Sequence, residues 1–224
     1  MNARSISIRY GEATTSFVAF ARTLSEHDWA TPVPCTPLWT ARELLSHVTG
    51  VPDDGLAGRL DGPATEPWTA SQVERNAEFG VDELLERFEQ QYEIFGAAIE
   101  SMGEERPAYD CHSHEHDLRH ALGRPGNRES MVIVDCSNAM VASLAEVSVS
   151  IAIDFGGGDV VNTGHGDAAV SIAMSRFEMF RSRLGRRSRE QVRSLPWDGD
   201  DAAIETVLDS WFLFGPSVDS IVEE

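Results

Sequence analysis

The stretch from Asp82 to Met102 carries the pattern that most restricts how this chain can fold. Large apolar residues recur there at steps of three and four. An α-helix turns once in about 3.6 residues, so this spacing gathers the apolar side chains on one face. Such a face is stable only against other elements, and it predicts a helix packed within a bundle. The apolar residues are Leu85, Phe88, Tyr92, Phe95, Ile99 and Met102.

Further helices are expected before and after this one. The segment Phe17–Leu24 is amphipathic. Thr40 and Glu43 have the spacing of a capping box, so a second helix is expected to begin after Thr40. Thr69 and Gln72 repeat that spacing and predict a short helix from about residue 70.

Two more helices are expected on the C-terminal side of Met102. Pro107 is suited to the first turn of a helix, and Gly123 is suited to follow its end. A helix is also expected from about Glu129 to Leu144, although its "MVIV" segment would also fit a strand.

The period of the apolar residues then changes from helical to two. Between Val147 and Asp154 apolar residues alternate with small or polar ones, which predicts a half-buried strand. We therefore divide the chain near residue 145, into a helical domain (1–145) and a small α/β domain (146–224) with a short, mainly antiparallel sheet. The later elements expected are strands near Val160 and at Ala169–Ile172, a helix ending at Leu184, and shorter helices near Gln191 and at Ala203–Leu213.

The balance of charge excludes two classes of partner. The chain has 18 basic residues, all of them arginine, against 37 acidic residues, and its net charge is −19. Such a surface repels phosphates and anionic lipids, so neither a nucleic acid nor a membrane is expected as a partner. The absence of lysine is also typical of a GC-rich genome, because arginine codons are rich in G and C.

The cysteine content indicates a reducing compartment. The three cysteines cannot all pair within one chain, and no Cys-x-x-Cys motif occurs. The first twenty residues contain no apolar segment long enough for a signal peptide or a membrane span. We therefore expect a cytoplasmic protein, and the sequence leaves open whether it is a monomer or a homodimer.

The densest group of metal-binding residue types lies between Asp110 and His120, where four histidines and three carboxylates share one predicted helix. Successive helical residues are rotated by about 100°, so Asp110 and His114 share a stripe beside the apolar side. This inner pair is the better candidate for a metal site, although such residues also occur on solvated faces. The remaining histidines lie opposite the apolar side and are expected at the surface; they are His112, His116 and His120.

A third ligand would have to come from another helix. A catalytic zinc usually takes three protein ligands and leaves one position open. His47 is the candidate, because it shares a stripe of the predicted second helix with Leu44 and Val51. A lone histidine beside an apolar face is also common as a hydrogen-bonded core residue, so the spacing alone leaves both interpretations open.

Three segments carry a family resemblance, and they are "PVPCTPLWTARELLSHVTG", "HEHDLRHALGRPG" and "RFEMFRSRLGRRSREQVRSLPWDGD". They resemble signature segments of the mycothiol-dependent maleylpyruvate isomerase family, which belongs to the DinB-like metalloenzyme superfamily. The segments lie in both predicted domains. The resemblance implies an α+β protein with an N-terminal DinB-like four-helix bundle, which carries a divalent metal, and a small C-terminal α/β domain.

The resemblance also implies a set of metal ligands. The family has one histidine near the end of the second-helix motif and an acidic residue four positions before a histidine in the later helix. In this chain these positions are His47, Asp110 and His114. The family's acidic ligand is often glutamate, whereas aspartate is shorter by one methylene. The implied cofactors are Zn²⁺, or another divalent metal such as Ni²⁺, and mycothiol, the small thiol of the GC-rich actinobacteria.

An open metal site of this kind suggests a reaction. Two imidazoles and one carboxylate leave positive charge on the metal, so a thiol in the open position loses its proton near neutral pH. The expected enzyme is a mycothiol-dependent isomerase or S-transferase whose thiolate attacks an electrophilic small molecule. Two alternatives stay open: a DinB-like metal-binding module without thiol chemistry, active in binding or stress response, and a hydrolase that uses metal-bound water.

The sequence also suggests roles for four other residues. Asp117 is a candidate to orient a ligand histidine, or equally to form a cap or an ion pair within the bundle. Arg186 and Arg187 are candidates to bind a carboxylate of mycothiol or of the substrate, and they would also complement the dipole of the preceding helix. Trp39 is expected to pack rather than to bind a ligand.

Overall fold

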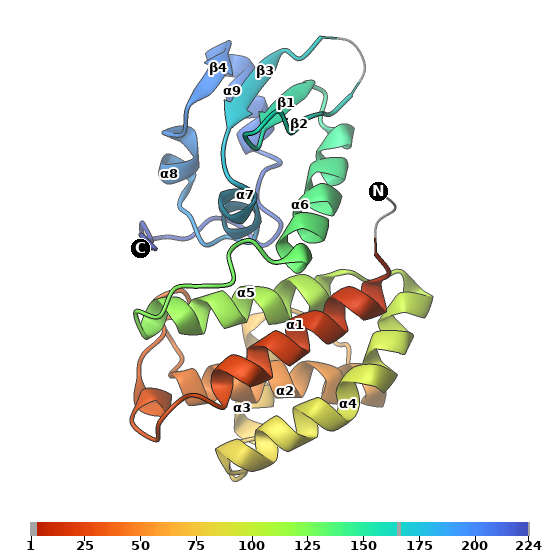
Figure 1. Ribbon diagram of the computed structural model, residues 1–224, viewed down its shortest axis with the longest axis vertical. Helices are drawn as coiled ribbons and strands as arrows, with labels where there is room; N and C mark the ends of the chain where they lie inside the picture. Colours follow the sequence, from red (N-terminus) through yellow and green to blue (C-terminus); the bar gives the residue numbers. More distant parts are fainter. Residues whose placement is uncertain (1–3, 165–166, 224) are drawn as a thin grey trace. The chain divides into compact units, whose positions relative to one another are not determined.

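The computed structural model describes residues 4–164 and 167–223. Its contacts separate two compact units, one ending at Gly126 and one beginning at Asn127. The first unit is helical, and the second combines helices with a small sheet (Figure 1). This order confirms the predicted α+β fold class. None of the described helices is long and apolar enough to cross a membrane.

Four helices of the first unit form the predicted bundle. Helices α1 and α2 each pack against both α4 and α5, while α3 packs on α2 and lies outside this set. The chain reaches α2 through a short 3-10 turn, η1. The bounds are α1 (Ile6–Ala21), η1 (Asp28–Ala30), α2 (Ala41–Ala57), α3 (Glu66–Arg75), α4 (Val81–Met102) and α5 (Arg106–Ala121).

The apolar face of α4 lies in the bundle core, as its spacing predicts. Phe88 is buried and meets the ring of Phe17 on α1 with the centroids 5.9 Å apart. Phe95 is also buried, and its ring lies 5.3 Å from that of Tyr10 in an edge-on arrangement. Met102 is exposed, because the helix ends there and Gly103 follows with the left-handed φ of 66°.

Helix α2 has no room for a side chain at Gly55, where it faces Phe95 of α4. A Cβ atom added to Gly55 would lie 2.3 Å from Cε2 of Phe95, which is far below any normal contact. The ring of Phe95 cannot move away freely, because it packs edge-on against Tyr10. Gly96 on α4 is different, since its added Cβ would find only ordinary contacts with Ser7 at 3.7 Å.

We predict that Gly55→Ala destabilises the bundle by about 1–3 kcal/mol, the usual cost of overpacking a filled core. Gly96→Ala is the matched control. It should be neutral or stabilising by up to about 1 kcal/mol, because alanine favours a helix interior more than glycine does. Chemical denaturation followed by circular dichroism measures both changes. Equal stability of the two variants would contradict the close approach at Gly55.

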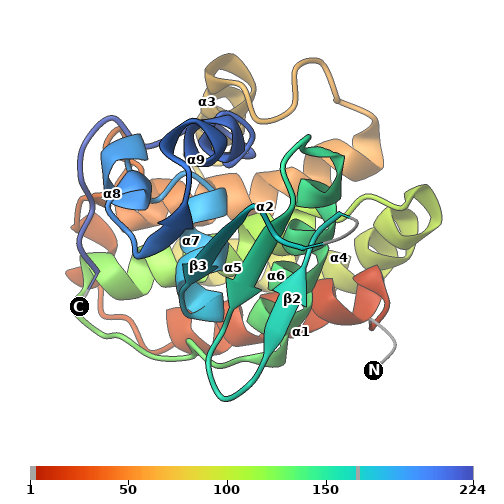
Figure 2. The same ribbon diagram turned by 90° about the horizontal axis from the view of Figure 1, so that it is seen from above.

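The second unit contains a four-stranded sheet in the order β2-β1-β3-β4 (Figure 2). The β1–β2 and β3–β4 pairs are antiparallel and only β1–β3 is parallel, so the predicted mainly antiparallel sheet is confirmed. Strand β4 was not expected from the sequence. The bounds are α6 (Met131–Ser143), η2 (Leu144–Glu146), β1 (Ile151–Asp154), β2 (Val160–Asn162), β3 (Val170–Ala173), α7 (Arg176–Arg183), α8 (Arg189–Arg193), β4 (Trp197–Gly199) and α9 (Asp201–Leu208).

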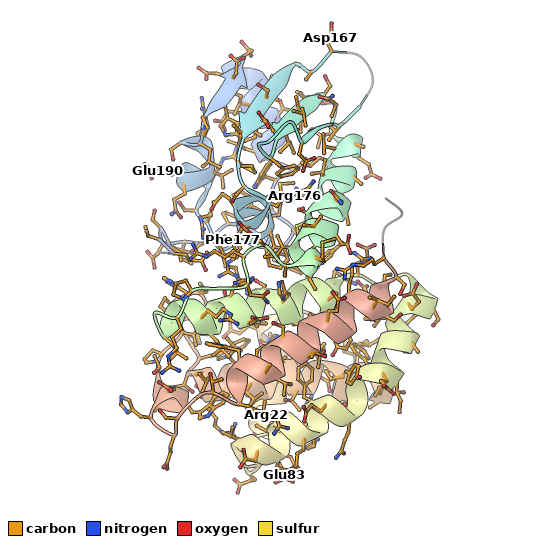
Figure 3. The ribbon with its side chains drawn as sticks, viewed as in Figure 1. Arg22, Glu83, Asp167, Arg176, Phe177 and Glu190 are labelled. Carbon is orange, nitrogen blue, oxygen red and sulfur yellow. The ribbon has the colours of Figure 1, made fainter. Side chains whose placement is uncertain are left out.

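The domain boundary predicted near residue 145 is too late. The "MVIV" segment is helical and not a strand. Its helix, α6, belongs to the second unit, where it packs against α7. Arg176, labelled in Figure 3, joins the two helices by donating to the Ser137 hydroxyl at 2.7 Å and to Asn138 at 2.8 Å. A change in apolar period marks the start of a sheet, and here a helix of the same unit precedes that sheet.

The first predicted strand is shorter than its alternation suggests. Residues 147–150 are irregular, and β1 begins at Ile151, where pairing with Val170 of β3 begins. Alternation shows which side chains would share a face, but a strand forms only where a partner supplies hydrogen bonds. The "GHGD" segment (164–167) is typical of a turn, and its residues 165 and 166 lie outside the described residues.

Candidate metal centre

Helix α2 positions the first candidate ligand. The predicted capping box is confirmed: the Glu43 carboxylate accepts from the Thr40 backbone N–H at 2.7 Å, and the Thr40 hydroxyl accepts from the Glu43 N–H. The cap defines where the helix starts, and His47 follows two turns later. Its side chain is only 4% exposed.

Helix α5 positions the other two candidates one turn apart. Nε2 of His114 lies 3.3 Å from one oxygen of Asp110, and Nε2 of His47 lies 3.4 Å from the other. One ligand atom from each of the three residues falls within 4.8 Å of the others, and no other such group occurs among the described residues. The structure thus brings together the three residues predicted as ligands.

The donor set fits a divalent metal. Two imidazole nitrogens and one carboxylate oxygen are the ligands of several catalytic zinc sites, which keep a fourth position open. Tetrahedral ligands at about 2.0–2.1 Å from zinc lie about 3.3–3.4 Å from each other. Asp110 meets the two histidines through different oxygens, at 3.4 Å and 3.3 Å, and one ligand atom from each residue lies within 4.8 Å of the other two.

The second nitrogen of each imidazole has its own partner. Nδ1 of His114 lies 2.9 Å from the Asp117 carboxylate, a contact compatible with both roles considered for Asp117, the orientation of a ligand histidine and an ion pair within the bundle. Nδ1 of His47 lies 2.6 Å from Oε1 of Gln72. Partners of this kind fix the ring and direct the other nitrogen, Nε2, toward a metal.

Gln72 is the site residue that the sequence analysis missed. Its spacing from Thr69 was interpreted as a capping box, but α3 already begins at Glu66, and Gln72 lies within the helix and is fully buried. The Thr69 hydroxyl instead donates to the Glu66 carbonyl. A glutamine on a mainly polar helix gives no sequence signal that distinguishes a buried hydrogen-bonding partner from a surface residue.

The charges of the cluster stabilise one another. Burial opposes ionisation of Asp110, but the rings of His114 and His47 outweigh it and lower the pKa of this carboxyl far below its usual range. Burial also opposes protonation of His114, yet the Asp110 and Asp117 carboxylates raise its pKa above the ordinary value. Without a metal, the cluster therefore attracts a proton, and a divalent cation would compete for the same place.

Two tryptophans adjoin the cluster. The ring of Trp39 lies 4.9 Å from that of His47 and 6.1 Å from that of His114, and Trp68 approaches His47 edge-on at 6.3 Å. Trp39 thus packs, as expected, but it packs on the candidate ligands themselves. Asp110 is the accessible member, with 30% of its side chain exposed.

The prediction that the outer histidines lie at the surface is wrong for two of them. His112 and His116 are buried and His120 is half-buried. The helical wheel finds the apolar side of α5 but cannot show that the polar side is covered as well. Glu115 makes that burial tolerable: its carboxylate lies 3.4 Å from His112 and accepts from Arg119 at 2.8 Å.

The two arginines proposed as anion-binding residues lie in the second unit. Arg187 is buried and makes a two-pronged contact with Glu178 and another with Glu223 at 2.9 Å, so the structure does not support it as a receptor for an outside carboxylate. Arg186 donates to the Leu184 carbonyl at 2.7 Å, and its role in ligand binding stays a prediction.

Together, the bundle and the histidine–aspartate–histidine cluster define an α+β protein whose helical unit carries a candidate metal centre. The family model of the mycothiol maleylpyruvate isomerase N-terminal domain matches residues 10–123, and the chain belongs to this family. The matched segment ends close to the boundary at Gly126 and includes all three candidate ligands.

Two solved structures are similar to about four-fifths of the chain. One is a mycothiol-dependent maleylpyruvate isomerase, with 10% identity and a TM-score of 0.48, covering 81% of this chain and 88% of that one. The other is a histidine-to-alanine mutant described under the same enzyme name, with 9% identity, a TM-score of 0.48 and coverage of 80% and 88%. No curated protein sequence matches the chain.

Proposed function

We propose that this protein is a metal-dependent enzyme that uses mycothiol as the nucleophile toward an electrophilic small molecule. The observation that carries the proposal is the convergence of His47, Asp110 and His114, whose ligand atoms lie within 4.8 Å of one another. The family relationship supports the choice of thiol. A reducing cytoplasm that contains mycothiol, as in actinobacteria, is the compartment we propose.

The three side chains have distinct tasks. His47 and His114 present Nε2, since their Nδ1 atoms are held by Gln72 and Asp117. Asp110 supplies the negative charge and is the most accessible of the three. A divalent metal held there would lower the pKa of a thiol that occupies its open position, so that the thiolate forms near neutral pH.

Two types of reaction are compatible with a thiolate bound at this site. In a cis–trans isomerisation, the thiolate forms a C–S bond to an activated double bond, the resulting single bond rotates, and elimination breaks the C–S bond and returns the thiolate. In an S-transfer, the C–S bond persists and a leaving group departs with its electron pair. Trp39 and Trp68 are the apolar surfaces beside the ligands against which a carbon skeleton would pack.

We predict that mycothiol binds the zinc-loaded protein and does not bind the metal-free protein. Isothermal titration calorimetry of both forms tests this directly, with an alcohol analogue that lacks the sulfur atom as the control ligand. If zinc-loaded protein gives no binding heat with mycothiol, a metal-binding module without thiol chemistry becomes the better interpretation. Turnover of an ester or amide without thiol would instead favour a hydrolase.

A further inference from the structure

A chain of buried hydrogen bonds extends from His47 away from the proposed metal. His47 Nδ1 meets Gln72 Oε1 at 2.6 Å, and Gln72 Nε2 donates to Asp54 Oδ2 at 2.8 Å. His47, Gln72 and Asp54 are all buried, and Gln72 and Asp54 have no exposed surface. At its far end, Asp54 Oδ1 accepts from Arg59 at 2.6 Å and from Arg75 at 2.5 Å.

The direction of every bond in this chain is set at the aspartate end. Two guanidinium groups donate to Asp54, and a carboxylate paired in this way only accepts. Gln72 must therefore turn its NH₂ group toward Asp54, which leaves its carbonyl oxygen facing the imidazole. That oxygen can only accept, so Nδ1 of His47 must carry the proton. In the neutral ring the lone pair is then on Nε2, which lies on the side of Asp110 and His114.

A glycine in α2 leaves room for the side chain of Gln72. A Cβ atom on Gly50 would lie 2.6 Å from Cβ and 2.8 Å from Cγ of Gln72. Only glycine at this position lets α3 bring the amide against the helix that carries His47. Asn76, one turn further along the chain, donates to the Ser46 carbonyl at 2.8 Å and holds the same contact from the other side.

We infer that Gln72 is a positioning residue that selects the Nδ1–H tautomer of His47 and thereby presents Nε2 as a ready metal ligand. This inference rests on the proposed metal site for its purpose, but the tautomer itself is a property of the metal-free protein. His114 differs, because its Nδ1 partner is the Asp117 carboxylate. The two histidines are thus prepared by different means, one by a neutral amide and one by an anion.

The test has two readouts. Long-range ¹H–¹⁵N correlation spectra of the metal-free protein, recorded at a pH where the imidazole ring is neutral, should show His47 protonated at Nδ1 and bare at Nε2. Gln72→Met keeps a side chain of similar length but removes both hydrogen bonds, so it should yield a mixture of tautomers. Its zinc affinity, measured by competition with a chelator, should fall by about 10–100-fold, the usual effect of losing such a partner.

The matched control is Gln91→Met. Gln91 also donates to a bundle aspartate, Asp53, at 2.7 Å, but it has no contact with His47. This variant should keep both the tautomer and the zinc affinity of the wild type. Wild-type His47 protonated at Nε2, or a Gln72→Met protein with an unchanged tautomer and affinity, would overturn the inference. A wild type with the expected tautomer that binds no zinc would instead refute the proposed function, while the selection of the His47 tautomer by Gln72 would stand.

Discussion

Replacing His114 with alanine should reduce the bound divalent metal from close to one equivalent per chain to background. Loss of a hydrogen-bonding partner behind a ligand already costs about 10–100-fold in affinity, and loss of a ligand itself should cost at least as much. His47→Ala and Asp110→Ala should behave in the same way, because the three donors form one cluster. Metal analysis of protein purified from zinc-supplemented medium measures the occupancy.

The control for this experiment comes from the same helix. His120 is half-buried, and no described residue group joins it to a metal cluster, so His120→Ala should keep full occupancy. Circular dichroism of each variant separates metal loss from unfolding. Full occupancy in a folded His114→Ala protein would show that the metal, if any, is bound elsewhere.

The second large effect concerns the charge of Asp110. Asp110→Asn keeps the shape of the side chain but removes the only formal negative charge among the three ligands, so zinc affinity should fall by about tenfold or more. Asp110→Glu should retain tight binding, because 30% of the aspartate side chain is exposed and one more methylene can be accommodated. Chelator competition at fixed pH gives the three affinities. Equal affinity of the aspartate and asparagine proteins would exclude Asp110 as a ligand.

Much of the first unit could be predicted because helical spacing and capping are local properties. The stripe from Leu85 to Ile99 predicted the core face of α4 except at Tyr92, which is half-buried, and Thr40 with Glu43 predicted the start of α2. The i, i+4 pair of Asp110 and His114 needs only one helical turn to meet. Joining that pair to His47 on another helix depended on family resemblance, since spacing alone left His47 ambiguous.

The predictions that were wrong concern features that depend on contacts between residues far apart in the sequence. Gln72 matched a cap by spacing, but its partners lie on a different helix, at His47 and Asp54. His112 looked solvated because the wheel places it opposite the apolar side, whereas it is buried beside Glu115. The boundary near residue 145 followed the start of alternation and ignored that α6 packs with α7.

Helix α3 lies outside the bundle core and nevertheless contributes to the candidate site. It packs on α2 but is not one of the four helices whose apolar faces fill the bundle, and its residues are mainly polar. Its Gln72 nevertheless holds one of the three candidate ligands from behind. At the proposed metal site, a substitution of Gln72 would change the hydrogen bonding of a ligand while the three ligands and the four core helices stay the same.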